Sequence, residues 1–106
     1  MSSLECAVSP RGADDDELLV CICGELDLAT ERELSEIIGA ALAKGPKRLV
    51  LDLSAVTFLC STGLRVLMAS NEEAQDLGCE FILQAVPTQA MRVFETTGTL
   101  RYFRIG

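Results

Sequence analysis

Residues 49–64 read LVLDLSAVTFLCSTGL and contain, in order, an apolar strand, a turn and the start of a helix. The segment Arg48–Leu53 is apolar on both faces at its centre, which is typical of a strand inside a parallel sheet. Ser54–Phe58 is predicted to form a turn, and a helix is expected from about Ser61 to Leu77, with Gly78 ending it. The core-facing stripe of this helix consists of Leu64, Leu67, Met68 and Leu77.

The chain before this segment predicts an opening hairpin. Leu4–Val8 is a weak candidate strand, and Ser9–Glu17 is a polar loop rich in turn-forming and acidic residues. Leu18–Cys23 follows as a nearly continuous apolar strand that ends at Gly24.

A first helix is predicted between the hairpin and residue 45. Its apolar residues recur at helical spacing, namely Leu34, Ile37, Ile38, Ala41 and Leu42. Thr30 and Glu33 fit a capping box at its start, and Gly45 with Pro46 stops it.

The remaining chain continues the alternation of strands and helices. Glu80–Leu83 is predicted as a strand, a short helix is expected from about Thr88 to Thr96, and Leu100–Ile105 closes the chain. Strands that alternate with helices form parallel crossovers. The fold class is therefore α/β, with a mixed four- to five-stranded sheet and about three main helices.

Composition and charge restrict the partners that this chain can have. Its 106 residues, 49% apolar and 24% charged, fit one globular domain over residues 1–106. The net charge of −7 disfavours nucleic acid and anionic membranes. No apolar stretch is long enough to cross a bilayer, and Met1–Pro10 lacks the basic start and apolar core of a signal peptide. We therefore expect a cytoplasmic protein with a protein partner. Residues 1–36 carry a balance of −8, which serves either solubility or steering toward a basic partner.

Five cysteines are best explained as buried thiols in a reducing compartment. Cys21 and Cys23 are expected on the same face of a strand. Because the chain has no histidine, we expect neither a metal site nor a Ser-His pair, and no sequence pattern indicates a cofactor. Asp52, at a predicted strand end, is expected to form a turn rather than act as a base.

Two loops are candidate functional segments, because in α/β sheets function gathers beyond the carboxyl ends of strands. They are Gly24–Thr30 and Phe58–Gly63. Ser61 and Thr62 fall where a helix begins, so a hydroxyl there is first of all an N-cap. A phosphate on the same hydroxyl would also be stabilised by the amides of the first helical turn.

These segments resemble the STAS domain of bacterial anti-sigma factor antagonists. The family pattern is apolar-Asp-Leu-Ser-x-Val-x-Phe-apolar-Asp-Ser-[Ser/Thr]-Gly-Leu, and residues 51–64 follow it at all but one position. Residues 24–27, GELD, match a second family motif before the first helix. The resemblance covers residues 18–105 in order.

The resemblance implies partner switching rather than catalysis. In this family an unphosphorylated antagonist binds an anti-sigma factor and so frees a sigma factor for transcription in stress or sporulation signalling. The anti-sigma factor is also a serine kinase, and it is the kinase that binds ATP. Phosphorylation abolishes the complex, and a PP2C-like phosphatase restores it. Carried onto this chain, the phosphoacceptor is Ser61, with a partner surface made of Glu25, Asp27, Cys60, Ser61, Thr62 and Gly63.

One departure from the family pattern is Cys60, which stands where the family has Asp beside the phosphorylated serine. It leaves open a STAS interaction module that docks without phosphorylation. Residues 60–65 also fit C-x-x-G-x-R, similar to the sulfur-transfer loop of rhodaneses, with Cys60 as the thiolate. This enzymatic alternative ranks below the two binding functions, because Leu64 and Arg65 are expected on a helix.

Overall fold

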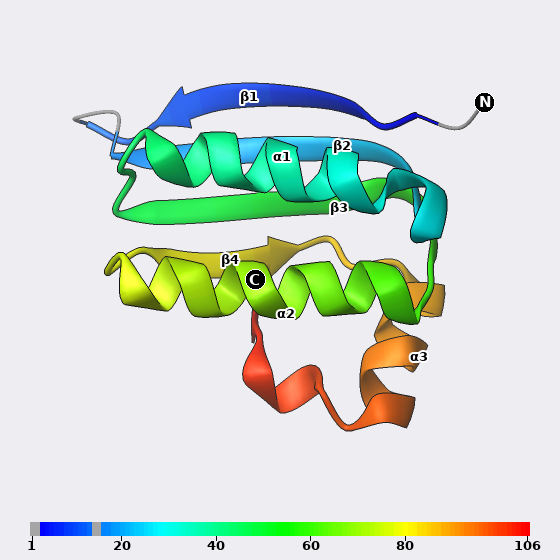
Figure 1. Cartoon of the computed structure of the whole chain (residues 1–106). Helices are drawn as coiled ribbons and strands as arrows, with labels where there is room; N and C mark the ends of the chain where they lie inside the picture. The colour runs from blue at the N-terminus through cyan, green and yellow to red at the C-terminus, as the bar shows by residue number, and fades with distance from the viewer. Residues whose placement is uncertain (1–2, 14–15) are drawn as a thin grey trace.

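The computed structural model describes residues 3–13 and 16–106, in which five strands form one sheet with three α-helices (Figure 1). The elements are β1 (Glu5–Arg11), β2 (Glu17–Leu26), η1 (Leu28–Thr30), α1 (Glu31–Ala43), β3 (Arg48–Leu59), α2 (Ser61–Asp76), β4 (Glu80–Gln84), α3 (Thr88–Thr97), η2 (Leu100–Tyr102) and β5 (Arg104–Ile105). The predicted α/β class and mixed sheet are confirmed. Asp14 and Asp15 of the predicted loop lie outside the described residues.

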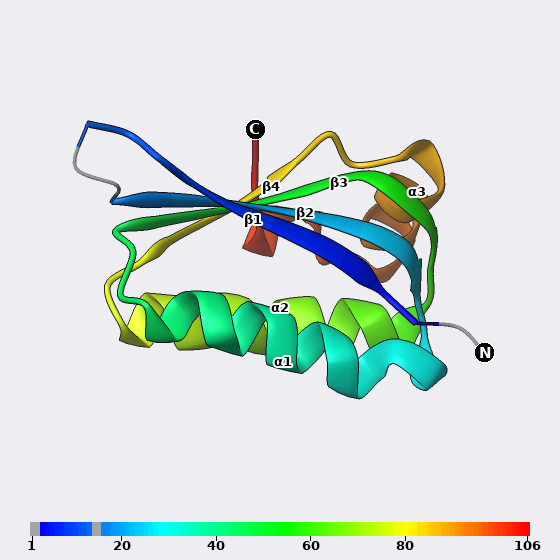
Figure 2. The same ribbon diagram turned by 90° about the horizontal axis from the view of Figure 1, so that it is seen from above.

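The sheet has the strand order β1-β2-β3-β4-β5, with β1 antiparallel to β2 and the other neighbours parallel. The crossover helices α1 and α2 lie side by side on one face (Figure 2). Alternate strand residues such as Val20, Leu51 and Leu83 are fully buried beneath them, against Leu34 and Leu67. None of the described helices has the length and apolar character to cross a membrane.

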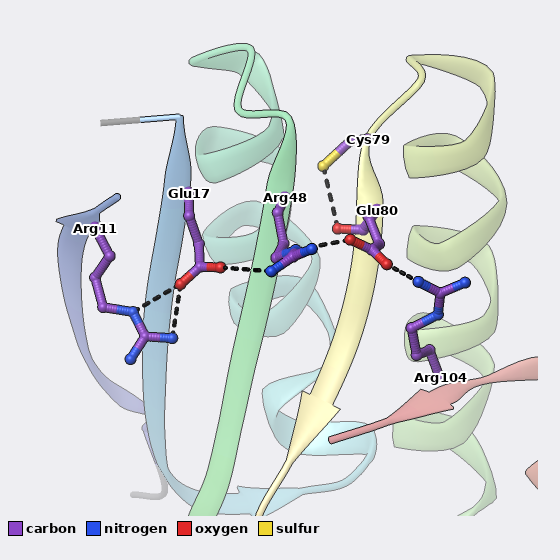
Figure 3. Close-up of polar contacts among 6 residues, drawn as sticks. All are labelled: Arg11, Glu17, Arg48, Cys79, Glu80 and Arg104. Carbon is purple, nitrogen blue, oxygen red and sulfur yellow. Dashed lines mark hydrogen bonds and ion pairs between the residues drawn. The ribbon is translucent and has the colours of Figure 1, made fainter. Parts of the chain in front are cut away.

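The opposite face of the sheet carries a charge ladder of five residues, one from each strand (Figure 3). These residues alternate in sign across the sheet: Arg11, Glu17, Arg48, Glu80 and Arg104. Nitrogen–oxygen distances are 2.7 Å from Arg11 to Glu17, 3.4 Å from Arg48 to Glu17 and 2.7 Å from Arg48 to Glu80, and Arg104 also pairs with Glu80. Because the arginines are exposed, each pair contributes little to the free energy of folding.

The predicted turn at Ser54–Phe58 is wrong, because β3 continues through it to Leu59. Strand β2 continues to Leu26 and keeps pairing with β3 across two register shifts. The backbone of residues 54–58 therefore lies in the sheet and not in a turn. Asp52 consequently lies within β3 and not at its end; its carboxylate accepts the Ser54 N–H at 2.9 Å.

Two predictions about the interior also fail. Leu77 is 60% exposed, because α2 ends at Asp76 and Leu77 is its C-cap. Among the cysteines Cys79 is buried, Cys21 and Cys60 are intermediate, and Cys6 and Cys23 are exposed. The reason is topological: β1 is an edge strand, and Cys21 and Cys23 alternate with the buried positions of β2, on the face opposite α1 and α2.

Candidate functional site

The two candidate loops meet at one end of the sheet. They begin in the last residues of the neighbouring parallel strands β2 and β3 and continue beyond them. The Cys60 N–H donates a hydrogen bond to the carbonyl oxygen of Leu26 at 3.0 Å. The negative charge of Asp27 in the first loop raises the pKa of the Cys60 thiol in the second. The structure thus brings together the segments that the sequence placed at the carboxyl ends of strands.

Ser61 is exposed and is the first residue of α2. The predicted N-cap role belongs instead to Cys60, whose extended backbone (φ −110°, ψ −179°) turns the chain into the helix. No side chain makes a capping hydrogen bond there. The Ser61 hydroxyl is therefore not occupied in capping, and it lies where unpaired helix amides and the helix dipole favour negative charge.

The Cys60 thiol responds to the same helix terminus. Partial burial raises its pKa, but the backbone N–H groups of Gly63 and Thr62, with the Thr62 hydroxyl, outweigh burial and lower the pKa below 9.0. The Cys60 side chain nevertheless makes no capping hydrogen bond to these backbone N–H groups. Residues 61–65 are helical, so they do not form a loop around the sulfur as the sulfur-transfer alternative requires.

Gly63 is buried and sets how closely α2 approaches β2. A Cβ atom at this position would lie 2.5 Å from the Leu26 carbonyl oxygen and 2.8 Å from both Leu26 Cβ and Leu59 Cδ1. A side chain here would push the start of α2 away from the sheet. Gly63 therefore positions Ser61 from beneath the surface.

Asp27 also caps the short 3-10 helix η1. Its carboxylate accepts the Thr30 N–H at 3.2 Å, and its own N–H donates to the Thr30 hydroxyl at 3.1 Å, which forms a capping box at η1. The predicted box of Thr30 with Glu33 is wrong, because the chain makes this 3-10 turn before α1 and Glu33 instead accepts the Leu4 N–H at 3.1 Å. Glu25 is exposed at the end of β2.

Gln89, at the start of α3, is a contributor that the sequence did not reveal. Its side-chain amide accepts from the Leu59 N–H at 2.8 Å and donates to the Leu59 carbonyl at 2.9 Å. It thus satisfies both backbone groups of the last residue of β3, next to the start of α2. A lone glutamine on a short helix carries no sequence signal for this role.

Large apolar side chains are exposed at the same end of the sheet: Leu28 at 75% and Phe58 at 43%. Single exposed apolar side chains are normal on a protein surface, so these two do not by themselves define a binding site. Within residues 3–13 and 16–106, no cluster of three or more histidine, cysteine or carboxylate side chains could hold a metal ion.

Comparisons with known proteins give the family of this chain. A family model described as "Mlab, STAS domain" matches residues 11–101. The anti-sigma-F factor antagonist RsfB of Mycobacterium tuberculosis is 49% identical over 55 residues, which span 52% of this chain and only 45% of RsfB. BtrV of Bordetella bronchiseptica, also named as an anti-sigma factor antagonist, is 30% identical over 91 residues, 86% of this chain and 78% of BtrV.

A solved structure agrees with the sequence relatives. The crystal structure of an anti-sigma factor antagonist from Mycobacterium paratuberculosis has a TM-score of 0.84 at 33% identity and covers 96% of this chain and 84% of that one. The chain therefore belongs to the STAS domain family, in which its named bacterial relatives are anti-sigma factor antagonists.

Proposed function

We propose that residues 1–106 act as one STAS module that binds an anti-sigma factor through a surface named here the Ser61 surface: Glu25, Asp27, Cys60, Ser61 and Thr62, with Gly63 beneath it. The observation that carries the proposal is the exposure of Ser61 at the first position of α2. The names of RsfB and BtrV support this class of partner. In this function the chain binds and is modified, and it is not a catalyst.

Phosphorylation of Ser61 is the proposed switch. The anti-sigma factor, acting as a serine kinase, transfers the γ-phosphoryl group of ATP to the Ser61 oxygen, ADP leaves, and the hydroxyl proton passes to the kinase. The phosphate brings up to two negative charges. Burying this charge against a partner surface that offers no base to pair with it costs several kcal/mol, so the complex dissociates. A PP2C-like phosphatase removes the group by hydrolysis and restores binding.

The test is a phosphorylation reaction with a purified anti-sigma factor of the histidine-kinase-like type and Mg²⁺-ATP. Peptide mass spectrometry should place one phosphate on Ser61. The Ser61→Ala variant should bind the kinase and remain unmodified, and Ser61→Asp should bind more weakly. Phosphate on Thr62 or Thr57 instead would contradict the assignment, and binding without any phosphorylation would favour a STAS module that docks unmodified.

The position of the Ser61 surface is tested by charge reversal. Asp27 is a poor choice because its carboxylate caps η1, so Glu25→Lys is preferred, since Glu25 is exposed at the rim of the surface. Calorimetry should show about tenfold weaker binding, or ~1.4 kcal/mol. Asp76→Lys, an exposed reversal at the far end of α2, is the matched control. Equal losses in the two variants would put the interface elsewhere.

A further inference from the structure

A groove of about 510 Å³ lies between α1 and α2. Its lining on α2 starts at Arg65, one helical turn after Ser61, and its lining on α1 includes Arg32. The two helices run in parallel and begin at the same end of the sheet, as Figures 1 and 2 show. Two arginines from different helices therefore line one groove, and one of them, Arg65, stands four residues after Ser61 on α2.

Arg65 is well placed to reach a group on Ser61. Residues four apart on a helix are neighbours on one face, with Cβ atoms about 5–6 Å apart. Both Arg32 and Arg65 are exposed, and no ion pair within 4.0 Å that involves either is found among residues 3–13 and 16–106. Their guanidinium groups are therefore available to a new anion, and a planar guanidinium fork matches two phosphate oxygens.

Carboxylates near the groove oppose an added anion and must be weighed. Glu31 and Glu36 of α1 and Glu73 of α2 line the groove, and Asp27 lies near Cys60. Glu73 stands twelve residues from Ser61, about 18 Å along the helix, beyond the screening length of about 8 Å in physiological salt. Asp27 already accepts a hydrogen bond from Thr30. Glu31 is next to Arg32 on α1 and Glu36 is four residues after it, so these two carboxylates offset the charge of Arg32 more than that of Arg65. Arg65 is the groove charge nearest to Ser61 along α2.

We propose, resting on Ser61 being the phosphorylated residue, that Arg65 binds the Ser61 phosphate within the same chain and that Arg32 adds a second cation from across the groove. The phosphate of the phosphorylated chain is then paired with arginines of the same chain. The same contact withdraws the Arg65 guanidinium from any partner that docks beside Ser61, so phosphorylation changes two groups of the interface at once.

The test uses the full chain with phosphoserine encoded at position 61, so it does not depend on any kinase. Phosphorus NMR gives the second pKa of the phosphate, about 6 in an ordinary phosphoserine. Adjacent cations favour the dianion and lower this pKa. Arg65→Ala should therefore raise it by ~0.5 unit or more, roughly a threefold change in the acid dissociation constant, and Arg32→Ala should raise it by less.

Lys44→Ala is the matched control, because it removes one positive charge at the other end of α1. It should leave the phosphate pKa within about 0.1 unit at physiological salt. Arg65→Lys, which keeps the charge but loses the fork, should fall between wild type and Arg65→Ala. Equal shifts in Arg65→Ala and Lys44→Ala would overturn the proposed contact itself. Phosphorylation at another residue in the kinase reaction would instead overturn the proposed function, and with it the role of this contact in the switch.

Discussion

Replacing Gly63 with alanine should destabilise the protein even though alanine is the better helix former. The added Cβ would lie 2.5 Å from the Leu26 carbonyl oxygen, a backbone atom that cannot move aside cheaply. Overpacking of this kind costs ~1–3 kcal/mol. Moving α2 outward also strains the bond from the Cys60 N–H to the same oxygen, worth about 1 kcal/mol. The higher helix propensity of alanine offsets about 1 kcal/mol of this loss, so the free energy of unfolding should fall by ~1–3 kcal/mol.

Gly39 provides the matched control, since it also lies inside a helix and a Cβ there meets no atom within 4 Å. Gly39→Ala should raise the free energy of unfolding by about 0.5–1 kcal/mol. Both values come from urea unfolding followed by circular dichroism. If Gly63→Ala stabilises the protein as much as Gly39→Ala, close packing of α2 on β2 is not the reason for the glycine.

Two further changes probe the β3 end and the sheet. Gln89→Ala should lower the free energy of unfolding by about 1–2 kcal/mol, because both Leu59 backbone groups lose their hydrogen-bond partner. The control is Gln75→Ala at an exposed position, which should change the free energy of unfolding by less than about 0.5 kcal/mol in the same urea titration. Hydrogen bonds from Ser54 lower the pKa of Asp52 below 3.8. Since this pKa is lower in the folded state, the stabilisation is present above pH 3.8 and is lost as the pH falls below it. Asp52→Asn should flatten that part of a stability–pH curve, and an unchanged curve would contradict the assignment.

The fold could be predicted from the sequence where periodicity and helix stops agree. The buried stripe of α1 and the strand Glu80–Gln84 follow directly from apolar spacing. The extension of β3 through Ser54–Phe58 could not be predicted, because its bulged pairing depends on β2 continuing to Leu26. Exposure of Cys23 was also missed, since an apolar run does not reveal which face of a strand remains without a helix.

The candidate site also has a part that could be predicted from the sequence and a part that could not. The exposed position of Ser61 at the start of α2 could be predicted, because loop location and helix onset are both local properties. The support around it could not be predicted, since it joins distant segments. Gln89 reaches Leu59 thirty residues away, and Leu26 meets both Cys60 and Gly63 across the sheet. Local pattern predicted an exposed helix start at Ser61, and long-range packing holds that helix start in place.

The charge ladder bears on how the chain selects its strand order. Every ladder residue has only opposite charges beside it, so exchanging β3 and β4 would bring Glu17 next to Glu80 and Arg48 next to Arg104. Like charges directly opposite on neighbouring strands are destabilising. Pairs that contribute little to the native sheet can therefore still penalise a misassembled one. Because β2, β3, β4 and β5 are all parallel, this alternation helps the chain to tell its native strand order from the exchanged one.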